Sequence, residues 1–481
     1  MTGRLIVISN RIPTEEEPAG GLVFALHEAL RARGGIWVGT HPHTSEIVSD
    51  GFEQVGADAG YERLAFRITD QEYRNYYLGF SNSVLWPVCH GRGDLVELRR
   101  EFETGYASVN SRLAHQLAKI MQPDDIIWVH DYHFIPLAEE LRALGVRNRI
   151  GFFLHIPFPG LGNVGALPNG FDLPKKLACY DLIGLQTRAD VAKCLETFRA
   201  DTRAELMLDG IIKLNANCVV VRSFPIGIDV DDFRKTAAEP DLSHDIVTSY
   251  PRDLIIGVDR LDYSKGLPNR FRAFASFLSD RPDHMERVSF LQVAPPTREE
   301  VLAYRDIRLE LEELAGRVNG EYSELDWTPL RYIHRSVPRK ILAQLYRRAT
   351  VGLVTPLADG MNLVAKEFIA AQDPEDPGVL ILSRTAGAAE DMTEALLVNP
   401  YDVQDISDAI REALEMTRTE RIQRYRACMS VVENTAVDIW SRNYLAALIR
   451  TKGQLYDFRS RQGFELQSGF FRHPNLAVEE A

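Results

Sequence analysis

The chain lacks long apolar runs, and its charge balance is acidic. None of its 481 residues lies in an apolar stretch long enough to cross a bilayer, which takes about 20 residues. Residues 1–10 are too few and too strand-like to form a signal peptide. The formal net charge of −13 gives no bulk attraction to nucleic acid or to an anionic membrane. We therefore expect neither as a partner, and any phosphate ligand must be bound by a local basic pocket.

Cysteine is also scarce, and its pattern excludes two further classes of protein. The five cysteines are odd in number and scattered, with no Cys-x-x-Cys pair. Neither a zinc site nor a disulfide framework is indicated. We therefore expect reduced thiols and a cytoplasmic protein. The residues concerned are Cys89, Cys179, Cys194, Cys218 and Cys428.

What the chain does have is a regular alternation of short apolar runs with helical patterns. Such alternation is typical of parallel sheets covered by helices. The runs form two series, which predicts two doubly wound α/β domains joined near residues 225–232. The predicted strands are 4–9, 126–130, 150–155, 182–186 and 218–224 in the first series, and 254–258, 288–293, 351–355, 379–383 and 395–399 in the second.

The predicted division places one domain at 1–228 and a second at 229–450. A C-terminal helix and tail at 451–481 are then free to pack back on the first domain. The helical stretch 417–458 carries no strand signal, so it either packs on one domain or crosses between them. Residues 467–481 have the composition of a frayed tail.

Functional residues are expected directly after strands, because ligands of open parallel sheets bind beyond the carboxyl ends of the strands. Two facing sheets place the active site in the cleft between them. The segment 355–367 follows a strand, and its helix is predicted to begin near Asn362. Free N–H groups at that helix start favour a diphosphate, with Glu367 near a ribose and Asp359 near a sugar hydroxyl. A capped helix with surface charges explains the same residues equally well.

A second segment, 258–267, also follows a strand and carries Arg260 and Lys265 across a turn. Two cations at this place suit a phosphate leaving group, which gains negative charge as the glycosidic bond breaks. The alternative is a surface ion pair of either cation with Asp259 or Asp262.

Histidines accompany two further strand ends. Asp131 lies between His130 and His133, which resembles a metal cluster at first sight, but no third ligand is indicated. We interpret Asp131 as a hydrogen-bond acceptor for sugar hydroxyls. His155 ends the next strand before two prolines, and a satisfied core histidine competes with a binding role there.

Two patterns resemble known motifs and are rejected. The sequence Gly-Leu-Gly-Asn-Val-Gly at 160–165 matches the dinucleotide fingerprint as text, but prolines on both sides prevent the required strand-to-helix connection. We expect a flexible loop there. Asp229-Val-Asp231 resembles a metal-binding Asp-x-Asp, but it precedes a polar helix and is predicted to cap it.

These segments occur together with others in one order along the chain. The ordered motifs are Ser-Asn10-Arg11, Ala-Gly20-Gly21-Leu, Tyr-Tyr77, Phe-Ser-Asn-x-Val-Leu-Trp86, His-Asp131-Tyr-His, His155-Ile-Pro-Phe-Pro, Arg260-Leu-Asp-Tyr-Ser-Lys265-Gly and Asp359-Gly-Met-Asn-Leu-Val-Ala-Lys-Glu367. Over about residues 4–445 this order of motifs resembles that of the trehalose-phosphate synthase family, whose members are retaining glycosyltransferases with the GT-B fold. The resemblance implies two facing Rossmann-like domains with the active site in the interdomain cleft. It also implies glucose transfer from UDP-glucose to glucose 6-phosphate without a metal or cofactor, giving α,α-trehalose 6-phosphate and UDP.

The resemblance further implies a role for each matched residue, with acceptor binding on the N-terminal domain and nucleotide-sugar binding on the C-terminal one. The implied catalytic residues are Arg260, Lys265, Asp359 and His155. The implied donor-binding residues are Gly20, Gly21, Arg260, Lys265, Asp359, Gly360, Met361, Asn362, Leu363, Val364, Ala365, Lys366 and Glu367. The implied acceptor-binding residues are Arg11, Tyr77, Trp86, Asp131 and Arg298.

The chain departs from the family pattern mainly near the expected acceptor and gating regions. Thr40, Gly91 and Ala358 stand where the family often has tryptophan, an aromatic residue and arginine, and the segment 160–165 is richer in glycine. Two other functions therefore stay open. One is a transferase with another phosphorylated acceptor, such as a glucosylglycerol-phosphate synthase, and the other is a non-catalytic sugar-phosphate sensor. The donor base and a homo-oligomeric state stay open as well.

Overall fold

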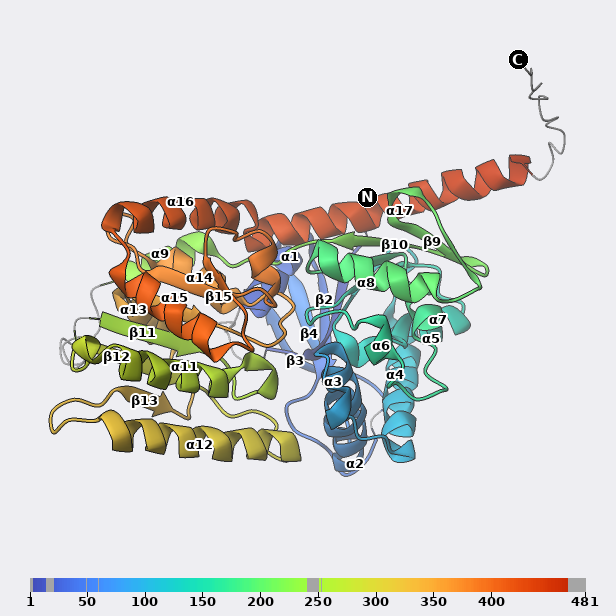
Figure 1. Ribbon diagram of the computed structural model, residues 1–481. Coiled ribbons are helices and arrows are strands. Elements are labelled where there is room, and N and C mark those ends of the chain that lie inside the picture. The colour runs from blue at the N-terminus through green and yellow to red at the C-terminus, as the bar shows by residue number, and fades with distance from the viewer. Residues whose placement is uncertain are drawn as a thin grey trace, which may run out of the picture.

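The protein consists of two α/β lobes that lie side by side, each with a sheet between layers of helices (Figure 1). The structure is a computed structural model that describes residues 3–13, 21–48, 50–58, 60–239, 251 and 253–465. We call the part with strands β1 to β10 the first lobe and the part with β11 to β16 the second lobe. Gly20 and the predicted tail at 467–481 lie outside the described residues.

The first lobe is built on a ten-stranded, mostly parallel sheet. Its central strand β1 pairs in parallel with β2 and β5, while β3, β8 and β9 run antiparallel to their neighbours. In sheet order the strands are β3 (Glu53–Asp58), β4 (Tyr61–Phe66), β2 (Gly35–Thr40), β1 (Leu5–Arg11), β5 (Ile126–His130), β6 (Arg149–Phe153), β7 (Leu182–Leu185), β10 (Asn217–Ser223), β9 (Ile211–Leu214) and β8 (Ala204–Leu206).

Helices cover both faces of this sheet because alternate residues of its buried strands point to opposite sides. Ile6 and Ile8 of β1 pack into one core, and Leu5 and Val7 pack into the other. The helices are α1 (Gly21–Arg33), α2 (Asp70–Glu72), the π-helix η1 (Tyr73–Leu85), α3 (Trp86–Cys89), α4 (Arg100–Ile120), α5 (Leu137–Ala143), α6 (Leu161–Val164), α7 (Leu173–Leu177) and α8 (Arg188–Arg199).

The second lobe is built on a six-stranded sheet whose strands are all parallel. In sheet order they are β13 (Leu330–Ile333), β12 (Val288–Val293), β11 (Asp253–Val258), β14 (Val351–Val354), β15 (Val379–Ser383) and β16 (Leu396–Val398). The helices around it are α9 (Val230–Ala238), α11 (Leu267–Asp280), α12 (Leu302–Tyr322), α13 (Arg339–Arg348), α14 (Leu363–Ala371), α15 (Val403–Glu415) and α16 (Arg418–Asn434).

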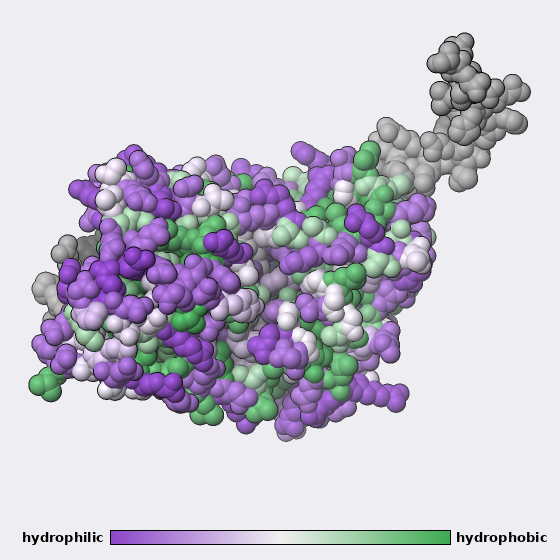
Figure 2. Space-filling model, in the orientation of Figure 1, coloured by the Kyte–Doolittle hydropathy of each residue, from purple (hydrophilic) through white to green (hydrophobic). Residues whose placement is uncertain are grey.

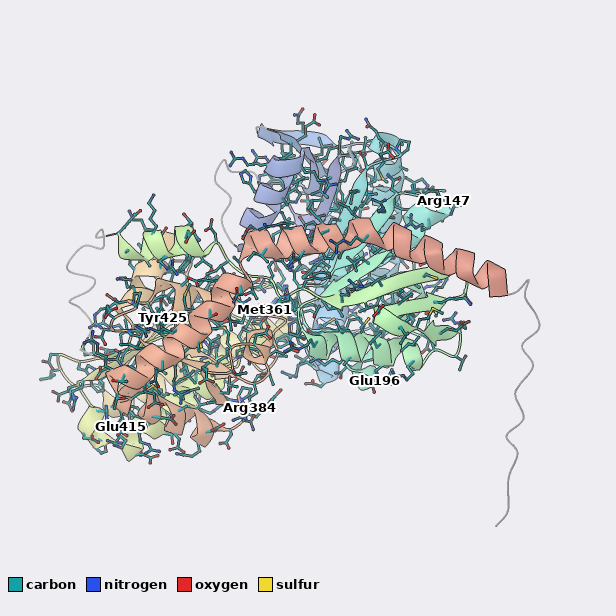
Figure 3. All side chains as sticks on the ribbon, turned by 90° about the horizontal axis from the view of Figure 1, so that it is seen from above. Arg147, Glu196, Met361, Arg384, Glu415 and Tyr425 are labelled. Carbon is teal, nitrogen blue, oxygen red and sulfur yellow. The ribbon has the colours of Figure 1, made fainter. Side chains whose placement is uncertain are left out.

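The C-terminal helix α17 (Val437–Glu465) crosses from the second lobe to the first (Figures 1 and 3). The ring centroids of Trp440 and Tyr444 lie 5.0 and 4.6 Å from that of Trp128 in β5. The Tyr444 hydroxyl also donates to the carbonyl of Phe152, at 3.0 Å. The helical stretch therefore does cross between the sheets, and its contacts with the first sheet include Trp440 and Tyr444.

Every strand predicted from an apolar run overlaps an observed strand, and the predicted boundary at 228 falls between β10 and β11. The side chain of Asp229 accepts a hydrogen bond from the N–H of Asp232 at 3.0 Å, which confirms it as the cap of α9. The segment 160–165 differs from the expected loop because it contains the short helix α6. None of the described helices combines the length and the apolar character needed to cross a membrane.

Candidate active site

The second lobe presents two cations after β11, in the segment predicted to bind a phosphate. Lys265 is buried at the end of the short helix η5 (Tyr263–Lys265), and its Nζ lies 2.5 Å from Oδ2 of Asp359. The local ion pairs considered as the alternative are not formed. Asp259 instead pairs with Arg270 at 2.7 Å, and Asp262 pairs with Arg298 at 3.5 Å.

Arg260 is exposed at the same strand end. Its guanidinium carbon lies 5.6 Å from the centroid of the Trp86 ring, which belongs to the first lobe. Within the described residues no carboxylate pairs with this guanidinium. Its positive charge is therefore available to a ligand between the lobes.

The segment after β14 leads into a helix start that is capped by its own side chain. Asn362 has a φ of +75° and caps α14, with its side-chain oxygen 3.2 Å from the N–H of Ala365. Its amide nitrogen donates to Oδ2 of Asp359 at 3.0 Å. Burial raises the pKa of Asp359, but the Lys265 ammonium and the Asn362 amide outweigh burial and hold that pKa below its usual value. Asp359 is therefore a fixed, charged carboxylate.

Gly360 brings the two lobes into direct contact beside this carboxylate. A Cβ at Gly360 would lie 2.1 Å from the carbonyl oxygen of His155, so only glycine fits there. The neighbouring Met361 is 4% exposed, and Figure 3 shows it where the lobes meet. Nε2 of His155 lies 3.0 Å from Nδ1 of His130, and burial lowers the pKa of His155 to about 3. The imidazole is therefore neutral and is held by hydrogen bonding.

The other residues of α14 face in different directions. Glu367 is half-buried, burial raises its pKa to about 7, and within the described residues its carboxylate has no hydrogen-bond partner. Lys366 is turned away from the cleft, and its Nζ donates to the carbonyl of Ile226 at 2.7 Å and to Oγ1 of Thr435 at 2.9 Å. Of the remaining candidates on this helix, Leu363 and Val364 are half-exposed and Ala365 is buried.

On the acceptor side, Arg298 reaches from the second lobe to the first. Its guanidinium lies over the ring of Trp86, with the central carbon 4.0 Å from the ring centroid. One terminal nitrogen donates to the hydroxyl of Tyr304 at 2.5 Å, and the other donates to the hydroxyl of Tyr132 at 3.1 Å. Arg298 itself has a φ of +52°, which is uncommon for a residue with a side chain.

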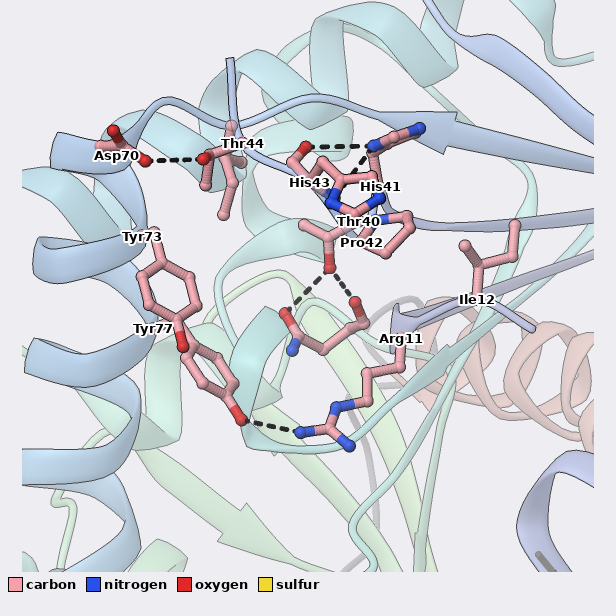
Figure 4. A pocket seen from close by; sticks show the side chains of 12 residues that line it. Arg11, Ile12, Thr40, His41, Pro42, His43, Thr44, Asp70, Tyr73 and Tyr77 are labelled. Carbon is pink, nitrogen blue, oxygen red and sulfur yellow. Dashed lines mark hydrogen bonds between the residues drawn. The ribbon is translucent and has the colours of Figure 1, made fainter. Parts of the chain in front are cut away.

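Arg11 and Tyr77 line a cavity of about 640 Å³ in the first lobe (Figure 4). A terminal nitrogen of Arg11 lies 3.4 Å from the Tyr77 hydroxyl. Burial raises the pKa of Tyr77, but the guanidinium groups of Arg298 and Arg11 outweigh it and lower that pKa overall. Thr40 lines the same cavity, so the space left by the missing tryptophan lies next to the predicted acceptor residues.

Asp131 directly follows β5 and has a φ of +72°, and its Oδ1 accepts from the N–H of His155 at 3.3 Å. Burial raises its pKa to about 6, against the opposing effect of Arg260 and Arg298. The flanking His133 stacks on Tyr77, with ring centroids 5.8 Å apart. Within the described residues no group of three His, Cys, Asp or Glu side chains is arranged to hold a metal ion.

A second cavity of about 650 Å³ lies between the lobes, and Figure 2 shows the surface hollowed there. Gly91, Ala358 and Gly160 line it together with Asp359. The departures from the family pattern therefore fall in two places, with Thr40 in the first cavity and these three residues in the second.

The structure thus divides the predicted residues between two cavities, with Arg11 and Tyr77 in the first and Asp359 in the second. Lys366 points away from both, Gly20 lies outside the described residues, and Gly21 is described only as the first residue of α1. The sequence did not reveal which residues hold the predicted site side chains in place. His130 and Asp262 were visible inside the motifs but were not assigned this role. Tyr304 had no signal, because it lies on a helix 42 residues away from Asp262.

Comparison with known proteins gives the same architecture and one family. A family model described as Glycosyltransferase family 20 matches residues 6–450. A trehalose-6-phosphate synthase of Sodalis glossinidius is 45% identical over 448 residues, which is 92% of this chain and 95% of that protein. A structure described as trehalose-6-phosphate from E. coli bound with UDP-2-fluoro glucose superposes with a TM-score of 0.89 at 42% identity, covering 93% of this chain and 99% of that one. A UDP-forming α,α-trehalose-phosphate synthase of Burkholderia xenovorans in complex with glucose-6-phosphate gives 0.88 at 43% identity, covering 93% and 100%.

Proposed function

The chain belongs to glycosyltransferase family 20, and from this premise we propose that it is a UDP-forming trehalose-6-phosphate synthase. It transfers glucose from UDP-glucose to glucose 6-phosphate and releases UDP. The fold is the two-sheet GT-B architecture of the relatives. Those relatives are described with a UDP-glucose analogue and with glucose-6-phosphate, which supports both substrates for this chain.

The observation that carries the proposal is the presence of four cationic side chains, contributed by both lobes, around the predicted site. Arg260 and Lys265 follow the end of β11, Arg11 lines the first cavity, and the charge of Arg298 acts on Tyr77, which lines the same cavity. A nucleotide diphosphate and a sugar phosphate each need such a site, and arginine binds phosphate through paired, charge-assisted hydrogen bonds. We assign the donor diphosphate to the first pair and the acceptor phosphate to the second.

The sugar groups are assigned to the carboxylates and the histidine. Asp359 and His155 hold the donor glucose, the free carboxylate of Glu367 accepts hydrogen bonds from the ribose, and Asp131 accepts from acceptor hydroxyls. Lys265 and Asn362 both donate to Oδ2 of Asp359, so this carboxylate is held in one orientation. It is placed to bind and orient the glucose.

Transfer with retention then proceeds on one face of the glucose ring. The bond from C1 to the phosphate oxygen breaks, the acceptor oxygen bonds to C1 from the same side, and the acceptor proton passes to the departing phosphate. Arg260 and Lys265 stabilise the negative charge that develops on that phosphate. Closure of the lobes over the donor excludes water and favours transfer over hydrolysis.

The two alternative functions make different demands on the cleft. A non-catalytic sensor has no need for the buried Lys265–Asp359 pair beside an exposed Arg260. A smaller phosphorylated acceptor, such as glycerol phosphate, keeps the arginines but needs less of the first cavity. All five cysteines are buried and none of them forms a disulfide, which supports reaction in the reducing cytoplasm.

The test is a matrix of donors against acceptors. UDP-, GDP- and ADP-glucose are each incubated with glucose 6-phosphate, glucose or glycerol 3-phosphate, and the products are identified by mass spectrometry. We expect a disaccharide phosphate from UDP-glucose and glucose 6-phosphate. A product formed only with glycerol 3-phosphate would indicate the transferase with another phosphorylated acceptor. The absence of a product from every pair would indicate the non-catalytic sensor.

A further inference from the structure

Asp262 is a buried carboxylate between the two proposed phosphate sites, and neither substrate role uses it. It is fully buried, and its backbone belongs to the segment that carries Arg260 and Lys265. The N–H of Lys265 donates to the carbonyl of Asp262 at 3.0 Å, and the N–H of Ser264 donates to its Oδ1 at 2.9 Å. Its backbone and one carboxylate oxygen are thus fixed within the donor segment.

The other carboxylate oxygen faces the acceptor arginine. Oδ2 of Asp262 lies 3.5 Å from a terminal nitrogen of Arg298 and accepts from the Tyr304 hydroxyl at 3.0 Å. The same nitrogen of Arg298 donates to that hydroxyl at 2.5 Å. Asp262, Tyr304 and Arg298 therefore form a closed triangle of hydrogen bonds and charge.

The triangle holds Arg298 in an orientation that leaves one of its donors free. Burial raises the pKa of Asp262, but the charges around it, with Arg298 the strongest, together outweigh burial and hold that pKa below its usual value. Because the side chain of Arg298 is only 5% exposed, its charge needs this partner. Its Nε is buried and has no hydrogen-bond partner within the described residues. This N–H, next to the nitrogen that contacts Tyr132, forms the edge that a phosphate oxygen pair can bind.

We propose that Asp262 is a positioning residue that couples the two phosphate sites. Its carboxylate aims Arg298 at the acceptor phosphate, while its backbone moves with the donor segment. A diphosphate that orders Arg260 and Lys265 therefore also orders Arg298, and coupling between binding sites is reciprocal. The inference rests on the proposed function, because it takes the donor diphosphate and the acceptor phosphate as the two ligands.

The chain offers a matched control in Asp259. This residue is also a buried carboxylate of the same segment paired with an arginine, but its partner Arg270 is fully buried within the second lobe. Asp259→Asn removes a comparable charge without touching Arg298. Tyr304→Phe removes one corner of the triangle and keeps the Asp262–Arg298 pair, so it tests the network with a smaller perturbation of folding.

The experiment measures binding of UDP and of glucose 6-phosphate by calorimetry, each alone and in the presence of the other. For the unaltered protein we expect each ligand to tighten the other by about fivefold or more. Asp262→Asn should bring this factor close to one and raise the acceptor KM about tenfold or more, with a smaller change in the donor KM. Tyr304→Phe should shift both quantities in the same direction by less. Asp259→Asn should lower the melting temperature and leave the coupling intact.

Three results overturn the proposal. The first is normal coupling in Asp262→Asn or, if that variant does not fold, in Tyr304→Phe. The second is an equal loss of coupling in Asp259→Asn, which would make the effect general to the segment. The third is an unaltered protein that binds both ligands independently. An unaltered protein that binds neither ligand contradicts the proposed function itself, and the inference falls with it.

Discussion

Arg260 and Lys265 are assigned the same catalytic task, but they differ in their surroundings, so methionine at each position should separate catalysis from stability. Both variants lose one cation that stabilises the leaving phosphate. Loss of one such contact lowers turnover by about 10²–10³. We expect this loss in Arg260→Met and in Lys265→Met alike.

Their stabilities should differ because only one of the two cations has a buried partner. The side chains of Lys265 and Asp359 are 10% and 14% exposed, so their pair is governed by burial and not by solvent screening. Removing one partner of a buried pair costs about 3–5 kcal/mol. The lower end applies here because Asn362 still donates to Asp359. A loss of about 3 kcal/mol lowers the melting temperature of a lobe of this size by about 6–12 °C.

Arg260→Met should leave the melting temperature within about 2 °C of the unaltered protein. Its guanidinium is exposed, and a substitution at such a surface position usually changes stability by no more than about 0.5 kcal/mol. The assays are initial rates at saturating UDP-glucose and glucose 6-phosphate, and thermal melts without ligand. Near-normal turnover in either variant would refute the leaving-group assignment. Equal melting temperatures for the two variants would refute the account of the Lys265–Asp359 pair.

Three further predictions concern pH, metals and the acceptor. Because the pKa of Glu367 is raised to about 7, we expect the KM for UDP-glucose to fall as the pH rises from about 6 to about 8, since the ionised carboxylate accepts hydrogen bonds from ribose hydroxyls better. In Glu367→Gln the KM should not change over the same pH range. An unchanged slope in that variant would contradict the ribose assignment. EDTA should leave the rate of UDP release intact, and a complete loss restored by added metal would show that a metal site was overlooked. In steady-state kinetics, Arg298→Ala should raise the KM for glucose 6-phosphate far more than the KM for UDP-glucose. The unaltered protein should use glucose poorly as an acceptor. Equal use of glucose and glucose 6-phosphate would refute the placement of the acceptor phosphate at Arg298.

Most of the parallel strands were predictable because their burial on both faces leaves a continuous apolar signal, although β2 and β13, which also pair in parallel, were not predicted. Leu5–Ile8 of β1 and Leu254–Val258 of β11 read directly as such runs. The strands β3 and β4 were not predicted, because they mix polar and apolar residues in a short antiparallel pair. The π-helix η1 was also missed, since its hydrogen-bonding pattern has no distinct periodicity in the sequence.

The candidate site could be predicted at the level of residue types but not of pairings. Strand ends marked Arg260, Lys265 and Asp359, since polar residues directly after apolar runs are conspicuous. Their partners come from tertiary structure, so sequence proximity suggested the wrong ones. Lys265 pairs with Asp359 at a separation of 94 residues, while Asp262, only three positions away, pairs with Arg298 instead.

The most direct test of the account is the structure of the product formed from UDP-glucose labelled with ¹³C at C1 of the glucose. The labelled donor is incubated with glucose 6-phosphate and the protein, and the reaction is followed by NMR. The account predicts one α-configured signal at the labelled carbon, linked to C1 of glucose 6-phosphate, with UDP released in equal amount. A β-configured product, a linkage to another carbon, or labelled free glucose as the main product would contradict it.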